Sequence, residues 1–323
     1  MGGDAMSSDS PSNIAVKIES LAYAYGDRQA LCELSLEILS GEIFCLLGPN
    51  GSGKTTLFRL LSTLASLQTG SVSVMENDLA DDAHAIRRLL GVVFQSPSLD
   101  RKLTVLENLR HQAAMYGLGK SVTAERIDEA TRRLGIDDRL HDRVETLSGG
   151  LSRRVELAKC MLHNPSILLL DEPSTGLDPA ARSDLWSYLR LLQSELGTTV
   201  LMTTHLLEEA DRSDRVGILH EGNLVALGEP NTLRAELGSD VVSIQCDNPS
   251  EVIDQLQTNW QLASRQLDGI VRLEETVSAE LLSDVMQSLS GQVDNISVGR
   301  PTLEDVFIHH TGHQFWHDVE VVQ

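Results

Sequence analysis

The sequence predicts an α/β fold: an α/β core with an antiparallel β subdomain and a helical insertion, and a small C-terminal α+β domain. An apolar run, 43–47, ends in a glycine-rich stretch and passes directly into a helix-forming segment. A second run, 167–170, is continuously apolar, which is typical of a parallel strand buried on both faces. Strand-like and helix-periodic segments alternate along most of the 323 residues, as in α/β proteins.

The first part of the chain predicts antiparallel strands followed by the core. The strands and helices expected as far as the insertion are strands 14–19, 21–25, 34–39 and 43–47, helix 54–64, strand 71–75, helix 83–90 and strand 91–94, which ends at Gln95. From about residue 96 to 160 the pattern changes to polar, helix-periodic segments at 104–116 and 123–134. Gly117 and Gly135 are placed to end these helices, which predicts a helical insertion.

The rest of the core is expected to alternate again between helices and buried strands. A helix opens at 148–150, and the later elements are strand 167–170, helix 179–196, strand 199–203, a short acidic helix beginning at His205, and closing strands 215–219 and 224–227.

A boundary is expected near residues 229–240, followed by a second, smaller domain. Its expected elements are strand 241–245, helix 249–258, strands 261–266 and 270–273, helix 278–289 and strand 293–298. This β-α-β-β-α-β order fits a ferredoxin-like unit. The predicted organisation is a disordered N-terminus at 1–13, a first domain at 14–232, an accessory domain at 240–312 and a tail at 313–323.

Composition restricts the classes of partner. The formal net charge is −21, with 47 acidic against 26 basic residues, which argues against a surface for nucleic acid or anionic lipid. The four cysteines, Cys32, Cys45, Cys160 and Cys246, are far apart, as in proteins of a reducing cytosol. No apolar stretch approaches the ~18 residues that a membrane helix needs, and the N-terminus lacks a leader pattern. We therefore expect neither nucleic-acid binding nor direct membrane insertion.

The glycine-rich stretch matches the pattern of a phosphate-binding loop, G-x-x-x-x-G-K-[ST]. Its residues are Gly48, Pro49, Asn50, Gly51, Ser52, Gly53, Lys54, Thr55 and Thr56. Gly51 and Gly53 allow successive N–H groups to converge on phosphate oxygens at a helix N-terminus. Lys54 is expected to reach the β- and γ-phosphates, and the Thr55 hydroxyl to bind Mg²⁺. The alternative is a glycine-rich turn that happens to contain a lysine.

An acidic pair, Asp171 and Glu172, follows the apolar run 167–170. Open α/β sheets bind their ligands at the carboxyl ends of their strands. Asp171 suits the binding of Mg²⁺ or its waters, and Glu172 could polarise an attacking water. The alternative is that the two acidic residues simply lead the chain out of the core.

With these motifs together, the chain resembles the ABC-type ATPases, the nucleotide-binding subunits of ABC transporters. The stretch 48–56 resembles their Walker A loop, Gln95 the Q-loop glutamine, 147–151 the signature, 168–172 the Walker B strand, 174–178 the D-loop and His205 the switch histidine. The resemblance implies ATP and Mg²⁺ as cofactors, with Gln95 contacting Mg²⁺ and the attacking water. All six elements occur in the order of the family.

The signature indicates how two subunits would share an ATP molecule. Ser148, Gly149 and Gly150 begin a helix, whose N–H groups and dipole can bind an anion without metal or lysine. The resemblance implies that ATP lies between the Walker A loop of one subunit and the signature of another, and that Asp178 contacts the facing subunit. The chain has one set of motifs, so it is expected to pair with itself or a close relative. Leu151 departs from the glutamine often found there.

Two further residues are assigned by position. His205 follows a core strand and is expected to sense the γ-phosphate and position the water. Tyr25 resembles the adenine-stacking aromatic residue of the family, with Tyr23 as its rival and a packing role open for either.

The segment 300–312 resembles the C-terminal tail of drug-resistance-type exporters of the ABC-2 type, such as the daunorubicin-resistance ATPases. Its alternative is an amphipathic helix that packs Leu303, Val306 and Phe307 on the second domain. His309 and His310 lack the spacing and third ligand of a metal site.

The sequence thus predicts an Mg²⁺-dependent ATPase subunit of an ABC exporter, at the inner face of the membrane. Its partners would be a second cassette and a separate permease that docks near Gln95 and the helical insertion. The alternative is a soluble ABC ATPase acting on a ribosome or another macromolecule, but those carry two fused cassettes or a long coiled coil. A kinase or GTPase is disfavoured by the signature.

Overall fold

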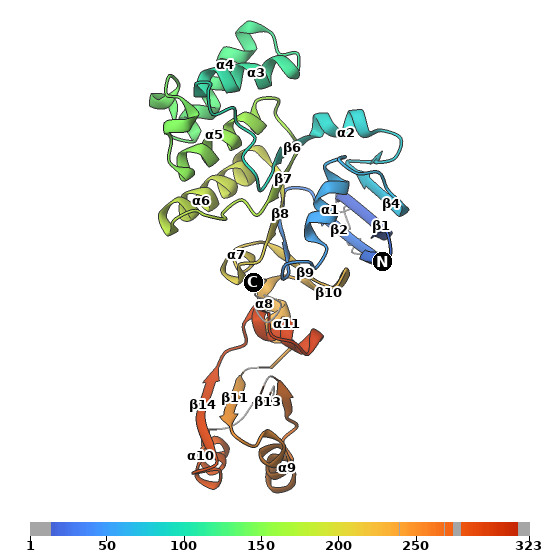
Figure 1. Ribbon diagram of the computed structural model, residues 1–323, viewed down its shortest axis with the longest axis vertical. Helices are drawn as coiled ribbons and strands as arrows, with labels where there is room; N and C mark the ends of the chain where they lie inside the picture. Colours follow the sequence, from blue (N-terminus) through green and yellow to red (C-terminus); the bar gives the residue numbers. More distant parts are fainter. Residues whose placement is uncertain (1–13, 239, 268, 274–278, 316–323) are drawn as a thin grey trace, which may run out of the picture. The chain divides into compact units, whose positions relative to one another are not determined.

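The computed structural model describes residues 14–238, 240–267, 269–273 and 279–315, which fall into two compact units (Figure 1). The first unit contains residues 14–45 and 53–204, and the second contains Leu46–Ser52 and the chain from His205 onward. The predicted disorder at 1–13 and most of the predicted tail lie outside the described residues. The predicted domain limits, 14–232 and 240–312, stay a prediction.

The first unit opens with an antiparallel sheet of strand order β2-β1-β4-β5. Its strands are β1 (Ile14–Tyr25), β2 (Arg28–Leu39), β4 (Thr69–Val74) and β5 (Asn77–Asp78). The sequence predicted two strands where β1 is one. The pairing of β1 with β2 shifts register between Ile18 and Leu21, and Ser20 there has a positive φ of 46°. A local irregularity therefore replaces the predicted break.

The sheet at the centre of this unit has the order β3-β8-β7-β6, in which β8, β7 and β6 are parallel. Its strands are β3 (Ile43–Leu47), β8 (Thr199–Thr204), β7 (Ile167–Asp171) and β6 (Leu90–Val93). All residues of β7 and β8 are buried, as the apolar run predicted. Helices α1 (Lys54–Leu61), α2 (Ala83–Leu89) and α6 (Pro179–Leu196) pack against strands of this sheet. Gln95 lies two residues beyond β6 and not at its last residue.

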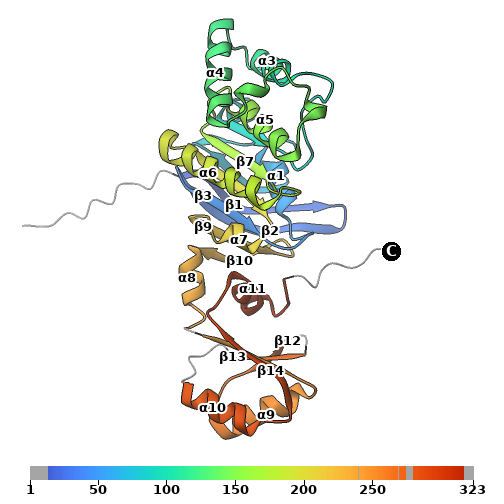
Figure 2. The same ribbon diagram turned by 90° about the vertical axis from the view of Figure 1, so that its left-hand side faces the viewer.

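The predicted helical insertion is present. It contains α3 (Val105–Met115), α4 (Lys120–Arg133), two short 3₁₀ turns and α5 (Gly149–Met161). Thr104 begins α3 with a capping box, because its hydroxyl accepts from the Glu107 N–H while the Glu107 carboxylate accepts from the Thr104 N–H. Helices α3 and α4 pack against each other and against α5 (Figures 1 and 2).

After His205 the second unit contains short elements, one of which the sequence misplaced and one of which it missed. These elements are α7 (Leu207–Ala210), β9 (Arg215–His220), β10 (Asn223–Gly228) and α8 (Pro230–Ala235). Helix α7 begins two residues after His205, which was predicted to start it. Helix α8 occupies part of the predicted boundary segment, because Pro230 provides a helical φ at the first position and Leu233 is buried.

The C-terminal sheet confirms the ferredoxin-like order. Its elements are β11 (Val241–Cys246), α9 (Pro249–Trp260), β12 (Arg265–Leu267), β13 (Ile270–Leu273), α10 (Ala279–Ser288) and β14 (Val293–Gly299). The strands are antiparallel in the order β12-β13-β11-β14. The strand predicted at 261–266 starts only at Arg265, since Gln261 ends α9 in a left-handed conformation with a φ of 58°.

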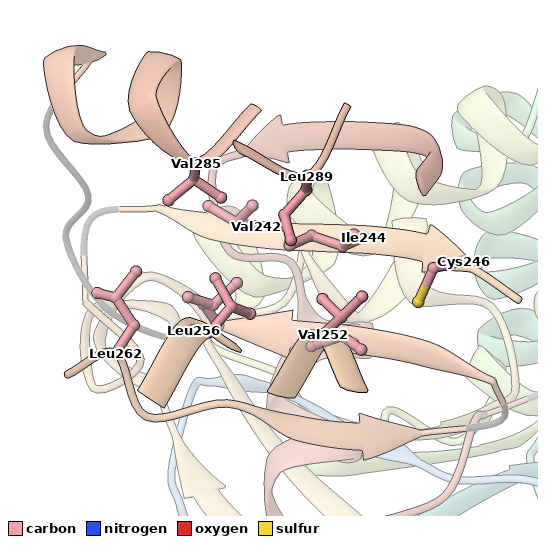
Figure 3. Close-up of a cluster of buried hydrophobic side chains, with 10 residues drawn as sticks. Val242, Ile244, Cys246, Val252, Leu256, Leu262, Val285 and Leu289 are labelled. Atoms are coloured by element: carbon pink, nitrogen blue, oxygen red, sulfur yellow. The ribbon is translucent and has the colours of Figure 1, made fainter. Parts of the chain in front are cut away.

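The core of this sheet lies between its strands and its two helices. Figure 3 shows Val242 and Ile244 of β11 facing Val252 and Leu256 of α9, Val285 of α10, and Leu289, which follows the last residue of α10. Each of these six side chains is almost completely buried.

The last helix, α11 (Leu303–Thr311), contacts α7, α8 and β10. The sequence placed it on the C-terminal domain, to which it is joined through an ion pair between Asp305 and Arg272 of β13. Phe307 is 1% exposed, and its ring meets the ring of His220 at 5.3 Å between centroids. Because His220 ends β9, α11 supports the β9–β10 hairpin.

We expect Phe307→Ala to destabilise the protein by about 3–5 kcal/mol, because it removes a buried aromatic side chain and leaves a cavity. His310 lies on the exposed side of the same helix, and His310→Ala should change stability by less than about 0.5 kcal/mol. Urea unfolding of the two variants beside the wild type measures the difference. Equal stability of Phe307→Ala and His310→Ala would contradict this role of α11.

Candidate functional site

The glycine-rich loop connects β3 to α1, as predicted. Gly51 and Gly53 have positive φ values of 82° and 109°, which only glycine adopts without strain. Gly53 precedes the first residue of α1, and no side chain caps this helix. No acidic residue lies in its first turn. The N-terminus of α1 therefore offers N–H groups and a positive dipole end to an anion.

The start of the loop is held closely by the β9–β10 hairpin. A Cβ added to Gly48 would lie 2.3 Å from the carbonyl oxygen of Leu219, so only glycine fits there. The Gly222 N–H donates to the Ser52 carbonyl at 2.9 Å. Within the described part of the chain, the hydroxyl of Ser52 is buried and lacks a hydrogen-bond partner. Such an orphaned donor inside the loop fits a phosphate oxygen.

We expect Gly48→Ala to distort the loop and to weaken ATP binding by at least about tenfold, because a backbone atom, Leu219 O, blocks the new Cβ. Gly299 is the matched control, since a Cβ there meets no atom within 4 Å. Titration of the two variants with a fluorescent ATP analogue measures the affinities. Wild-type affinity in Gly48→Ala would show that the close approach to Leu219 is not needed.

Lys54 and the acidic pair lie together in the first unit. Lys54 is 4% exposed, and its burial lowers the pKa of its amine, while the Glu172 and Asp171 carboxylates oppose this change. Burial likewise raises the pKa of Asp171, against the effect of the hydrogen bond from Thr203. The electrostatic influence of both carboxylates on Lys54 places the predicted phosphate-binding lysine close to the predicted metal ligand and base.

Thr203, at the end of β8, holds both acidic residues. Its hydroxyl donates to Asp171 Oδ1 at 2.6 Å and accepts from the Glu172 N–H at 3.0 Å. Sequence reasoning did not single out this threonine. A polar residue at the carboxyl end of the strand beside the acidic strand was the available signal, since parallel strand ends meet at one edge of a sheet.

Glu172 adopts a strained backbone with a φ of 45°, a conformation that concentrates at functional sites. Its Oε2 accepts from Gln95 Nε2 at 3.2 Å and from Thr175 Oγ1 at 3.2 Å. The structure therefore brings together Gln95 and Glu172, which are 77 positions apart in the sequence.

The signature and the D-loop each begin a helix. Ser148 caps α5, its Oγ accepting from the Leu151 N–H at 3.3 Å, and Asp178 caps α6, its Oδ1 accepting from the Ala181 N–H at 2.9 Å. A Cβ on Gly150 would lie 3.1 Å from the Cβ of Ala181, so Gly150 also allows α5 and α6 to approach closely. The roles of these residues toward a facing subunit stay predictions.

The remaining predicted residues are placed but not tested. Tyr25 is exposed and lies edge to face with Tyr23 at 5.0 Å between ring centroids, so the choice between these two tyrosines stays open. His205 follows β8 directly. Among the described residues, no group of three or more histidine, cysteine or acidic side chains could hold a metal. No helix in the described ranges has the length and apolar character to cross a bilayer.

Comparison with known proteins identifies the family of the chain. A family model described as ABC transporter matches residues 31–175, and a second, described as the C-terminal domain of DrrA1-3-like ATP-binding proteins, matches residues 228–311. The daunorubicin resistance ATP-binding protein DrrA3 of Streptomyces coeruleorubidus is 35% identical, covering 92% of this chain and 96% of the relative. The Nod factor export ATP-binding protein I of Sinorhizobium fredii is 37% identical, covering 95% and 89%.

Solved structures are similar over the cassette. The structure of cbiO1 from Clostridium perfringens, part of the ABC transporter complex cbiONQ, has a TM-score of 0.65 and 28% identity, covering 77% of this chain and 96% of that chain. A dimeric ATP-binding cassette in a post-hydrolysis state with ADP and Pi has a TM-score of 0.60 and 28% identity, covering 66% and 98%.

Proposed function

Because this chain belongs to the ATP-binding subunits of ABC transporters, in the subgroup of daunorubicin-resistance-type exporters, we propose that it powers export through a separate membrane permease. The chain is an ATPase by family, and such cassettes bind ATP or ADP. In our proposal, two cassettes close on two ATP molecules and hydrolysis reopens them. The observation that carries the proposal is the contact between Gln95 and Glu172 beside Asp171 and Lys54.

The residues present fit Mg·ATP. The uncapped N-terminus of α1, the orphaned Ser52 hydroxyl and the buried Lys54 amine suit phosphate oxygens. Thr55, Asp171 and Gln95 offer a hydroxyl, a carboxylate and an amide oxygen, which are the hard oxygen ligands that Mg²⁺ prefers. Mg²⁺ held by these residues would neutralise the negative charge that develops on the phosphate oxygens during hydrolysis. One carboxylate is enough for such a site, because the phosphates supply other ligands.

Residues of the chain itself bind the phosphates, activate the water and position the base. Lys54 binds the terminal phosphates. Thr203 orients the Asp171 carboxylate through its hydrogen bond. Glu172 orients the attacking water and accepts its proton, and Gln95 positions the Glu172 carboxylate through their hydrogen bond. His205 is assigned to the γ-phosphate and Tyr25 to the adenine. We assign Ser148, Gly149, Gly150 and Asp178 to the ATP of the facing cassette.

The second cassette is proposed to be another copy of this chain. One set of motifs per chain and a dimeric cassette among the similar structures support pairing. The permease is proposed to dock near Gln95 and the helical insertion and to hold the protein at the inner face of the membrane. The names of the exporter relatives support export as the direction of transport.

Affinity purification of the tagged chain from detergent-solubilised cells tests the transport role. We expect a membrane protein with several transmembrane helices to be recovered with the tagged chain. Variants of the chain that do not bind ATP should be recovered with the same membrane protein. Recovery with ribosomes and never with a membrane protein would refute the transport role and favour a macromolecule-directed ABC ATPase.

A further inference from the structure

Helix α5 holds the segment Phe94–Ser98, which carries Gln95, at three points. Arg153 Nη1 donates to the Phe94 carbonyl at 3.0 Å, and the Ser98 N–H donates to Glu156 Oε1 at 2.6 Å. Lys159 Nζ donates to the Ser98 carbonyl at 2.8 Å. These three α5 residues recur at every third position and so lie on one face of the helix. We call them the α5 clamp.

The centre of the clamp is a buried ion pair. Arg153 Nη1 also donates to Glu156 Oε2 at 2.9 Å, and the side chains of Arg153 and Glu156 are only 9% and 4% exposed. A charged pair this deeply buried is costly unless all its hydrogen bonds are made. Here the bonds that satisfy it go to the backbone at both ends of the Gln95 segment.

The clamp also reaches the proposed catalytic base. Arg153 Nη2 lies 3.5 Å from the Glu172 carbonyl, and the Glu172 carboxylate accepts from Gln95. Arg153 thus contacts the backbone of Phe94, which precedes Gln95, and the backbone of Glu172. Since Ser148 caps the N-terminus of α5, the helix that carries the signature is linked to that contact.

We propose that Arg153 and Glu156, with Lys159, are positioning residues that set Gln95 against Glu172 and transmit a shift of α5 to this contact. The proposal rests on the proposed function, because it concerns the same hydrolytic site. A ligand bound at the start of α5 would move Phe94 and Ser98 together with the helix. Misplacing Gln95 should slow hydrolysis and leave nucleotide binding at Lys54 largely intact.

The test compares ATP hydrolysis by the full chain and its variants. Arg153→Met should lower kcat by roughly 10- to 100-fold, as misplacement of a catalytic group does, with a KM for ATP changed by less than about threefold. Arg153→Met with Glu156→Leu replaces the buried pair by apolar side chains and should fold, because such replacements are often neutral for stability. Its kcat should also be low.

The control is Arg154→Met on the same helix. Arg154 donates to the Leu134 carbonyl and pairs with Asp184, away from the Gln95 segment. Its kcat should stay within about twofold of the wild type. Arg153→Lys keeps the charge but loses the second nitrogen of the fork, so its kcat should be intermediate.

A second measurement needs no ATP. Hydrogen exchange at the Ser98 amide, which donates to Glu156, should become at least about tenfold faster in the double variant and stay unchanged in Arg154→Met. Wild-type kcat, or unchanged exchange at Ser98, in the folded double variant would overturn the clamp. Absence of hydrolysis by the wild type would instead refute the proposed function, and exchange at Ser98 would still decide whether the clamp holds the segment.

Discussion

Glu172→Gln is expected to reduce ATP hydrolysis by about 10²- to 10⁴-fold, because it removes the proposed general base. The amide has nearly the shape of the carboxylate, so the strained backbone at Glu172 and its bonds to Thr203 should persist. The variant should still bind ATP through Lys54 and the loop. ATP that is bound but not hydrolysed should then hold two cassettes together.

Gel filtration with ATP and Mg²⁺ measures this trapped dimer, and phosphate release measures hydrolysis. Glu145→Gln is the matched control, since Glu145 pairs with Lys102 at the surface of the insertion. This control should hydrolyse ATP as the wild type does and show no trapped dimer. A Glu172→Gln variant that binds ATP and stays monomeric would argue against a shared site.

The sequence predicts candidate site residues, but it does not reveal the contacts that position them. The loop 48–56, Asp171 and Glu172 follow from local patterns, because a strand, a tight turn and a helix are specified by neighbouring residues. Thr203 and Arg153 act through contacts that join β8 to β7 and α5 to the segment after β6. Such contacts between distant parts of the chain leave no periodic signal in a single sequence.

The misplaced elements have local causes. Ser20 and Gln261 adopt positive φ values that their residue types rarely take. At Ser20 this produces an irregularity within β1 in place of the predicted break, and at Gln261 it ends α9, so that β12 starts later than predicted. Helix α8 was missed because Pro230, which can start a helix, was taken as part of a linker. The partners of α11 were missed since an amphipathic pattern shows that a helix packs and not on what.

Lys54→Ala is expected to weaken ATP binding by roughly 10- to 100-fold, since a charge-assisted hydrogen bond contributes about 1.5–3 kcal/mol and 1.4 kcal/mol corresponds to tenfold in affinity. Lys54 is buried at the start of α1, and its removal takes away a positive charge that interacts with the Asp171 and Glu172 carboxylates. Hydrolysis should fall with binding. Isothermal titration with ATP and Mg²⁺ measures the affinity.

Two variants show whether the position of this charge matters. Lys102→Ala removes a lysine whose side chain is 82% exposed, and it should bind ATP as the wild type does. Lys54→Arg keeps the charge but carries a larger, planar group into a buried position, so its affinity should fall well below the wild type. Wild-type affinity in Lys54→Ala would remove Lys54 from its phosphate-binding role. If Lys54→Arg bound ATP as the wild type does while Lys54→Ala did not, the site would need a positive charge at this position and not the compact ammonium group.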